Sequence, residues 1–504
     1  MTFRILIFVL FAFGTTINAA GTVKVDQAAS FSFRFTYSSL SPYQHQMVEQ
    51  FIGSFLPKDS NVQQILNNDD GAIQKIRLAE ALLFRNKDND QENAFEIIRW
   101  IYGLAKKDVE PASSDFVGSD LIIIYHKYRP LFPADVTEKV EFLLKNVARI
   151  TYNKNQNPNY NNMAIMSSFI MEYVGRLYNI EEIQVRGMEK ARAIVASYRI
   201  YNTLCEYNTP TYYGVDVMGL SLWKELSYSQ EMRELGTFLQ ESLWKEIAMY
   251  YNANLRNMCG PFLRGYGMDM TRYNAVIGVP IALAVDDEAL APFPGIVGGH
   301  YHDASYIAAF CELGVYLPGE AFREFRKFSA PRFFSRVTPN YYEGDRLKKA
   351  TAMVNREWMM GCLWGNLKVS SLLKVGTMHW KASNGVVGWL VVPGEGKTNV
   401  KVDETTMQIF LATDSAEFIE IFLYAPQLTA LKIAGKVWKL DGMELTVNSS
   451  LKYLAEQVKD SVGPHSFSDA QTIHYQDLVR VRFQITKGWD KSKPIINFIP
   501  KKNE

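Results

Sequence analysis

The sequence contains one short motif with the residue types of proton transfer, His300-Tyr-His302-Asp303. Histidine has the unperturbed side-chain pKa nearest neutrality, which makes His302 the first candidate for a proton donor or acceptor. The Asp303 carboxylate either orients the imidazole ring or caps the helix that follows. Two histidines at this spacing can also contribute to a metal site, but too few further ligands with a recognisable spacing accompany them. We therefore predict catalysis by His302, without a metal or another cofactor.

Amide and guanidinium groups gather in two further polar segments. Asn161 and Asn162 end the first, and Arg264 and Arg272 lie in the second. An arginine can hold a carboxylate by two parallel hydrogen bonds, which a lysine does less well. An asparagine amide can also neutralise a substrate carboxylate, although Asn is equally common at the start of a helix. These residue types favour a polyhydroxylated, acidic ligand.

Aromatic residues make up 13% of the chain, and four tyrosines lie in the segment with Arg264 and Arg272 or in a third polar segment, residues 205–214. They are Tyr207, Tyr212, Tyr213 and Tyr266. Their rings can stack on sugar rings while their hydroxyl groups donate hydrogen bonds. The alternative for each is a core ring with a satisfied hydroxyl.

Two carboxyl groups of these segments, Glu206 and Asp269, are candidates for the general acid and base of a hydrolase. Glycoside hydrolysis normally needs such a pair. The sequence has no G-x-S-x-G elbow, no GxxxxGK[ST] phosphate loop and no dinucleotide fingerprint. This pattern disfavours serine hydrolases and the common nucleotide-binding enzymes.

The elements that position these residues are helices from about Ser41 to Arg336. Amphipathic segments alternate with segments that are apolar nearly all round. The amphipathic segments include 92–100, 136–145, 180–201 and 229–250, and the apolar ones include 120–125, 163–171, 215–223 and 273–283. A helix that is apolar all round must be enclosed. The alternation predicts an inner ring of helices wrapped by an outer ring, an (α/α) toroid. A helical solenoid is the main alternative, but the sequence shows no fixed-period repeat.

Beyond about Asp345 the hydrophobic period changes to two. Short strands are predicted at 389–392, 406–411, 417–424, 443–447 and 479–485. Several antiparallel strands after a helical block predict a β-sandwich. The expected organisation is therefore multidomain, α then β, with a toroid over residues 20–345 and an antiparallel β-sandwich over residues 346–504.

The long loops of the predicted toroid all run from an outer helix to an inner one. In an antiparallel ring these connections share one end of the barrel. Sites are usually carried by such loops on a rigid scaffold. We therefore expect Asn162, Tyr213, Arg264 and His302 to face a common cavity at one mouth of the ring.

The N-terminus indicates the compartment. Arg4 precedes the apolar run 5–13, and small residues near Ala19 fit a cleavage site, so residues 1–19 are expected to be a signal peptide of a secreted protein. No segment is long and apolar enough to span a membrane.

With 54 basic and 53 acidic residues, the charge does not suggest nucleic-acid binding. Four cysteines leave free thiols and one or two disulfides equally open, and Asn448 is a single glycosylation acceptor.

Taken together, the secretory signal, the toroid with Asn-, Tyr-, Arg- and His-bearing loops and the C-terminal sandwich resemble the heparinase II/III-type and alginate-lyase-type polysaccharide lyases. The stretches 206–216 and 260–269 also resemble segments of secreted toroid proteins. The resemblance implies β-elimination from a uronic-acid polysaccharide. It would make Asn161 or Asn162 the neutraliser of the C5 carboxylate, His302 the base and Tyr212 or Tyr213 the acid.

From their residue types, the remaining polar residues of the mouth are expected to bind the substrate, an acidic polysaccharide or oligosaccharide. They are Asn161, Glu206, Tyr207, Arg264, Tyr266, Asp269 and Arg272. Two other reactions, glycoside hydrolysis and C5-epimerisation, remain open on the same scaffold. A non-catalytic glycan-binding toroid is the third alternative. It is favoured by the absence of an Asn-His pair, since Asn162 is followed by Met163.

Overall fold

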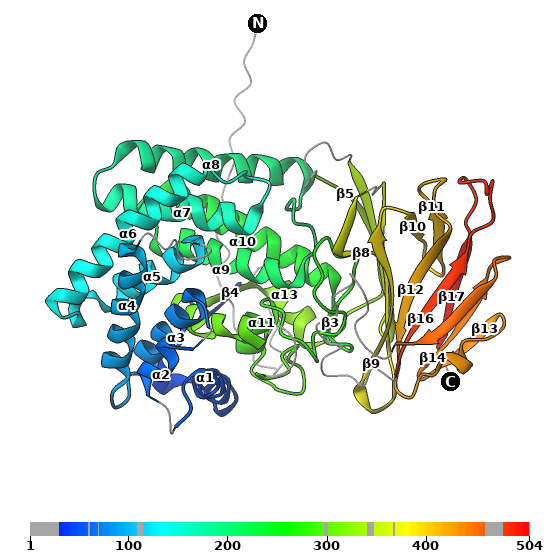
Figure 1. The fold of residues 1–504 in the computed structure, drawn as a ribbon, viewed down its shortest axis with the longest axis horizontal. Helices are drawn as coiled ribbons and strands as arrows, with labels where there is room; N and C mark the ends of the chain where they lie inside the picture. Colours follow the sequence, from blue (N-terminus) through cyan, green and yellow to red (C-terminus); the bar gives the residue numbers. More distant parts are fainter. Residues whose placement is uncertain are drawn as a thin grey trace, which may run out of the picture.

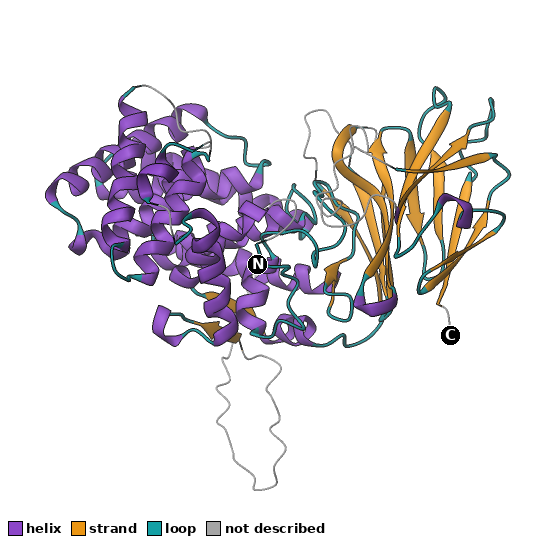
Figure 2. Ribbon diagram, turned by 60° about the horizontal axis from the view of Figure 1, so that its bottom comes forward, coloured by secondary structure: helices purple, strands orange, loops and turns teal. Residues whose placement is uncertain are grey.

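The computed structural model describes residues 30–58, 61–68, 70–107, 114–296, 301–339, 347–365, 368–458 and 477–502. Helices form the N-terminal part and sheets the C-terminal part, side by side along the long axis of the molecule (Figures 1 and 2). The expected signal peptide at 1–19 and His300 lie outside the described residues.

The helical part has two layers, as the two kinds of sequence pattern predicted. The outer layer contains the amphipathic helices α4 (Asp90–Lys106), α6 (Ala134–Lys154), α8 (Glu181–Tyr201) and α10 (Gln230–Tyr250). The inner layer contains α3 (Ala72–Arg85), α5 (Ser114–Tyr128), α7 (Asn161–Leu177) and α9 (Pro210–Leu226). Inner helices are buried on nearly every side; in α7 all residues from Asn161 to Gly175 are buried.

The inner layer closes on itself through two shorter helices, α11 (Gly278–Val285) and α12 (Ile307–Leu313). Helix α12 packs against both α3 and α9, and α11 packs against α9. The N-terminal helix α1 (Pro42–Phe55) packs on α3 and α12 from outside. This closure confirms the toroid and excludes an open solenoid. Residues 273–277 are not helical, so the last inner helix starts later than its apolar pattern predicted.

Short elements complete the helical part. They are β1 (Ser30–Phe33), α2 (Val62–Leu66), β2 (Tyr251–Asn252), β3 (Asn257–Met258), η3 (Tyr301–Tyr306), β4 (Val315–Pro318) and α13 (Gly319–Arg326). Strands β1 and β4 pair with each other, as do β2 and β3. None of the described helices is long and apolar enough to cross a membrane.

The C-terminal part contains two antiparallel sheets. The larger follows the order β15 (Tyr453–Gln457), β16 (Leu478–Gln484), β12 (Phe418–Tyr424), β9 (Val387–Glu395), β8 (Val369–Lys381), β7 (Trp358–Trp364), β6 (Lys348–Val354), β5 (Arg332–Thr338). The smaller follows the order β10 (Thr398–Val402), β11 (Met407–Leu411), β17 (Ile496–Lys502), β14 (Met443–Asn448), β13 (Val437–Leu440). Strand β5 precedes the boundary expected at residue 346.

The two sheets pack face to face as the predicted sandwich. The Trp438 ring on β13 lies 6.5 Å from the Phe483 ring on β16 in the other sheet and 5.8 Å from the Phe498 ring on β17. Apolar residues on the inner faces alternate with exposed residues, as in Val437, Trp438, Lys439 and Leu440.

A loop of the helical part is joined to the larger sheet by backbone hydrogen bonds. The Phe262 and Lys374 backbones exchange two of them, at 3.2 Å and 2.9 Å, and the Gly265 N–H donates to the Leu372 carbonyl at 2.8 Å. At Gly361 the two parts approach so closely that a Cβ atom would lie 1.7 Å from the Gly260 carbonyl oxygen. We refer to this junction between ring and sheet as the seam.

Candidate functional site

A depression of about 190 Å³ opens where the N-terminal ends of α3, α5 and α9 meet η3. This is the end of the ring reached by the outer-to-inner loops, and we call it the mouth. The polar residues that line the depression are Gln74, Arg77, Thr211, Tyr212, Tyr266, His302 and Asp303. Three of the predicted site residues, Tyr212, Tyr266 and His302, thus share one cavity.

Two phenols and a guanidinium group are in direct contact at the mouth. The hydroxyl groups of Tyr212 and Tyr266 are 2.6 Å apart. Arg264 donates from Nη2 to the Tyr212 hydroxyl at 2.7 Å, and its guanidinium carbon lies 3.9 Å from the centre of that ring. Burial raises the pKa of Tyr212 far above its ordinary value, and the positive charge of Arg264 only partly opposes this. Tyr212 therefore stays protonated and can donate.

A fully buried carboxylate fixes the arginine. Arg264 donates from Nη1 to Glu206 Oε1 at 2.7 Å, while the Asn162 backbone N–H donates to Glu206 Oε2 at 3.0 Å. The Asn162 side-chain amide donates to the same oxygen. Asn161 accepts a hydrogen bond from the Glu206 backbone at 3.0 Å. Both asparagines are buried and serve this network, so neither lines the depression as the expected carboxylate neutraliser would.

His302 is the accessible titratable group of the depression. Its side chain is 40% exposed, and its Nε2 lies 3.8 Å from Asp303 Oδ1. Asp303 also accepts a hydrogen bond from the Thr211 hydroxyl at 3.4 Å, which ties η3 to the start of α9. The neighbouring carboxylate can therefore orient the imidazole, one of the two roles considered for it.

Tyr213 does not reach the mouth. It is fully buried, and its hydroxyl lies 3.0 Å from Glu246 Oε1 and 3.2 Å from the Thr203 hydroxyl. Consecutive residues of an α-helix point about 100° apart, so Tyr212 and Tyr213 cannot share one cavity. The expected convergence of Tyr213 with His302 is wrong.

Tyr207 is also a core residue. It is buried, and its hydroxyl forms a hydrogen bond with that of Tyr250. Because the ring packs 5.8 Å from that of Tyr250 and does not line the depression, it is not placed for the expected stacking on a sugar. The core-ring alternative holds for Tyr207 as it does for Tyr213.

Asp269 and Arg272 lie away from the mouth. Asp269 Oδ1 accepts hydrogen bonds from the Asn257 side chain at 3.0 Å and from the Thr271 backbone at 2.9 Å. Its Oδ2 lies 3.6 Å from Arg272 Nε. After Tyr266 the loop leaves the mouth and runs along β2 and β3, so these two residues belong to a different surface.

Arg77 was missed by the sequence reasoning. It lines the depression with its guanidinium carbon 3.7 Å from the centre of the Tyr306 ring, and it pairs with Asp120 at 3.3 Å. Its Nη2 atom is buried without a hydrogen-bond partner among the described residues. The available signal was an arginine next to the apolar residues Ile76 and Leu78 of α3, because a charge at a buried position is seldom without a partner or a function.

Asp216 was missed as well. It lies one helical turn after Tyr212 on α9, is fully buried, and neither carboxylate oxygen has a hydrogen-bond partner among the described residues. Burial, and to a smaller degree the Glu206 charge, raises the pKa of Asp216 well above its ordinary value. A buried carboxyl group whose ionisation is disfavoured therefore lies one helical turn from Tyr212.

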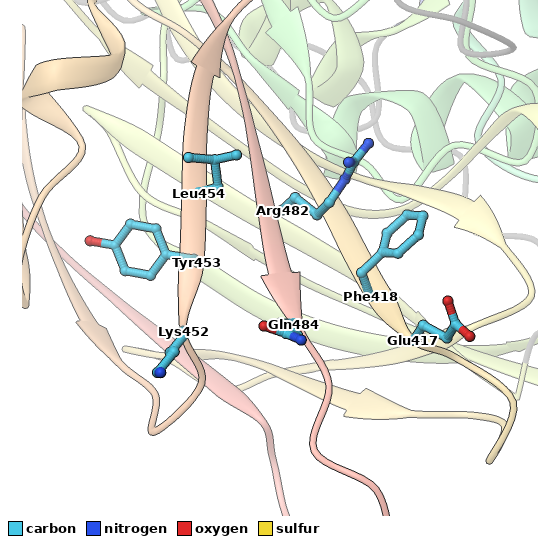
Figure 3. Close-up of a pocket in the computed structure, with 7 residues that line it drawn as sticks. All are labelled: Glu417, Phe418, Lys452, Tyr453, Leu454, Arg482 and Gln484. Carbon is cyan, nitrogen blue, oxygen red and sulfur yellow. The ribbon is translucent and has the colours of Figure 1, made fainter.

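A second hollow, of about 360 Å³, lies on the outer part of the larger sheet. Figure 3 shows that Phe418 and Arg482, on neighbouring strands, point the same way along it. Two of its polar side chains are already engaged, since Arg482 donates twice to Glu420 at 3.0 Å and 2.8 Å and the Tyr453 hydroxyl donates to the Gly435 carbonyl at 3.0 Å. No residue predicted for the site lies there.

Across the described part of the chain, no three His, Cys, Asp or Glu side chains are grouped so that they could hold a metal ion. The four cysteines are buried and unpaired, which agrees with the free-thiol alternative.

A family model described as a domain of unknown function (DUF8769) matches residues 106–313. No curated protein matches the chain. Among solved structures, the chain is similar to a heparinase III, the BT4657 gene product, with a TM-score of 0.36, 11% identity, and coverage of 92% of this chain and 85% of that chain. It is also similar to the endoglucanase CelQ from Clostridium thermocellum complexed with cellobiose and cellotriose, with a TM-score of 0.27, 10% identity, and coverage of 84% and 72%. The resemblance is a weak one of architecture and assigns no residue.

Proposed function

We propose that this chain is a secreted carbohydrate-active enzyme that cleaves an acidic polysaccharide by β-elimination at the mouth of the ring. One observation carries the proposal: the Tyr212 and Tyr266 hydroxyl groups, 2.6 Å apart, line the same depression as His302. A pair of protonated phenols beside an accessible imidazole supplies both the acid and the base that elimination needs.

The reaction begins with the carboxylate of a uronate unit. Arg77 lines the depression and is the cation suited to hold it, taking the place of the asparagine that the sequence suggested. Neutralising the carboxylate acidifies the C5 proton. His302 removes that proton, the released electron pair forms the C4–C5 double bond, and the C4–O bond to the leaving sugar breaks.

The leaving oxygen takes a proton from Tyr266 or Tyr212, and the hydrogen bond between them allows the second phenol to replace that proton. Arg264 positions Tyr212, and Glu206 positions Arg264 in turn. Asn161 and Asn162 hold Glu206 and are positioning residues as well. Preorganised donors of this kind need no rearrangement as charge develops, which is how they lower a barrier.

Glycoside hydrolysis is the second candidate, because two carboxyl groups lie at or below the depression. Asp303 lines it, and the buried Asp216, whose pKa is raised, lies one turn below Tyr212. A protonated carboxyl group and a second carboxylate are the parts that hydrolysis uses. Glu206 and Asp269, the pair suggested by the sequence, do not lie together. Glu206 accepts a hydrogen bond from Arg264 at the mouth, whereas Asp269 lies beside Arg272.

A screen of acidic polysaccharides separates these reactions. Elimination creates an unsaturated uronate that absorbs in the ultraviolet, whereas hydrolysis gives new reducing ends without that absorbance. Epimerisation at C5 incorporates solvent deuterium and cuts nothing. Binding without any product, unaffected by His302→Ala and Tyr212→Phe, would replace the enzyme proposal by a glycan-binding one.

Secretion is part of the proposal. It is supported by the N-terminal apolar segment and by Asn448, the residue of the glycosylation acceptor, which is exposed at the end of β14. Burial raises the pKa of Cys205 to about 11 and that of Cys362 to about 12, which lowers the reactivity of these thiols. Mass spectrometry of the protein recovered from the medium should show a chain that starts near Ala20. A chain that retains residues 1–19 contradicts this.

A further inference from the structure

A groove of about 380 Å³ lies between ring and sheet, where α1, the tip of the β2–β3 hairpin and the loop after α11 meet Gly385 and Val386 in the turn between β8 and β9. It shares no lining residue with the mouth depression. Ligand sites form preferentially where two domains meet, and this volume is within the usual range for small-ligand pockets.

The hairpin places Arg256 on one wall of the groove in an unusual backbone conformation. Its φ angle is 51°, in the left-handed region that residues other than glycine and asparagine seldom adopt. Its guanidinium group forms no ion pair with the described carboxylates, including the exposed Glu288 of the same groove. Strained backbone conformations are frequent at ligand sites. At Arg256 the strained residue also carries a charge that has no ion-pair partner among the described residues.

Arg272 supplies a second guanidinium group to the same groove. Asp269 lies 3.6 Å from its Nε, and the Tyr424 ring of β12 lies 5.6 Å from its guanidinium carbon. Asp269 is itself held by Asn257 and Thr271. Because these contacts fix Arg272 before any ligand arrives, little side-chain entropy remains to be lost on binding.

The opposite wall is formed by α1 and is neutral. Gln46 and Gln50 lie one helical turn apart and are exposed. The Tyr43 hydroxyl is buried and has no hydrogen-bond partner among the described residues. Amides and a phenol can donate to and accept from the hydroxyl groups of a sugar.

We propose that this groove is a second binding site, for an anionic saccharide unit. Arg256 and Arg272 hold its carboxylate or sulfate group, and Gln46, Gln50 and Tyr43 hold its ring hydroxyls. The choice of a saccharide rests on the function proposed for the mouth, whereas the anion specificity rests on the two arginines. The site would retain one part of a polymer while another part enters the mouth.

The test is titration calorimetry with a tetrasaccharide of galacturonic acid and, as the neutral probe, maltotetraose. The variant Arg256→Asn removes the guanidinium group but tolerates the left-handed backbone, so it should fold with an unchanged melting temperature. We expect it to weaken binding of the acidic probe at the groove at least about tenfold, the effect of losing one charge-assisted contact. Arg149→Ala, an exposed arginine on α6, removes the same charge elsewhere and should bind as the parent protein does.

Phenylglyoxal modification followed by mass spectrometry locates the site. The acidic tetrasaccharide should protect Arg256 and Arg272 from the reagent, and maltotetraose should not. Equal protection by both probes, or equal affinity of Arg256→Asn and the parent protein, overturns the proposal. Failure of the function proposed for the mouth is distinguishable, because it would remove the ultraviolet-absorbing product while leaving the protection of Arg256 intact.

Discussion

Tyr212 and Tyr213 are consecutive on α9, yet their hydroxyl groups belong to separate networks: that of Tyr212 meets Tyr266 at 2.6 Å, and that of Tyr213 meets Glu246 at 3.0 Å. The first network is at the mouth and the second is in the core. The pair therefore provides a test in which the same chemical change is made one residue apart.

Tyr212→Phe should reduce turnover of the acidic polysaccharide about 100-fold or more, because it removes a proton donor of the transition state. Tyr213→Phe should instead lower the free energy of unfolding by about 1–2 kcal/mol, the cost of a lost buried hydrogen bond. Its activity per folded molecule should be unchanged. Turnover and melting temperature measured on both variants decide this, and the reverse pattern contradicts the site.

His302→Ala should abolish most turnover, with a loss of about 100- to 10,000-fold, the usual contribution of a general base. Because the side chain is 40% exposed, the free energy of unfolding should change by less than about 0.5 kcal/mol. Circular dichroism melts and absorbance assays on one preparation measure both. Unchanged turnover per folded molecule would remove His302 from the mechanism.

Arg264→Met should lower the free energy of unfolding by about 3–5 kcal/mol, because it leaves the Glu206 carboxylate buried without its cation. The matched control is Arg192→Met, since Arg192 and Glu231 form an equally short pair, 2.7 Å, with side chains that are 54% and 45% exposed. Such exposed pairs contribute only about 0–1 kcal/mol. Urea denaturation compares the two. Similar effects would contradict a stabilising role for the buried pair of Arg264 and Glu206.

The buried carboxyl groups of the inner ring should make stability fall as the pH rises. Burial raises the pKa of Asp120 from 3.8 to about 6, and burial with the neighbouring Asp120 charge raises that of Glu80 well above 4.5. The folded protein then binds more protons than the unfolded chain from about pH 4 upward. The free energy of unfolding decreases through pH 4 to 6 and stays lower above that window.

Glu80→Gln should remove part of the decrease in the free energy of unfolding above pH 4, because an amide cannot ionise. We expect the variant to be more stable than the parent protein at pH 7 and equally stable below about pH 4. Glu138→Gln, at an exposed position of α6, should change neither value. Denaturation curves recorded across this pH range test the prediction, and a parallel offset at every pH would contradict it.

The arrangement of the ring and of half the mouth follows from the sequence because both depend on periodicity. Inner helices must be enclosed, so their N-terminal loops meet, and this brings Tyr212, Tyr266, Arg264 and Glu206 together. Which of two adjacent tyrosines faces the cavity depends on the rotation of α9, which a helix that is apolar on every side does not reveal.

The positions of four other residues could not be predicted from the loop sequences. Arg77 and Asp216 lie within the helices α3 and α9, whereas the site residues were expected on or beside the long loops that precede the inner helices. Asp269 and Arg272 leave the mouth because β2 and β3 and the non-helical residues 273–277 direct the chain toward the sheet. Strands β2 and β3 have two residues each, which is too short to give a hydrophobic period in the sequence.

The close contact of Gly361 with Gly260 affects what happens when the two parts of the chain are separated or exchanged. The loop that carries Arg264 and Tyr266 is part of the helical half of the sequence. Its position relative to the cavity is nevertheless fixed by backbone hydrogen bonds to β8. A ring expressed alone would keep the contacts of Arg264 with Glu206 and Tyr212 and lose the backbone hydrogen bonds that hold Phe262 and Gly265 on either side of it. Exchange of the C-terminal half between related chains would therefore alter specificity at a cavity to which that half contributes no lining residue.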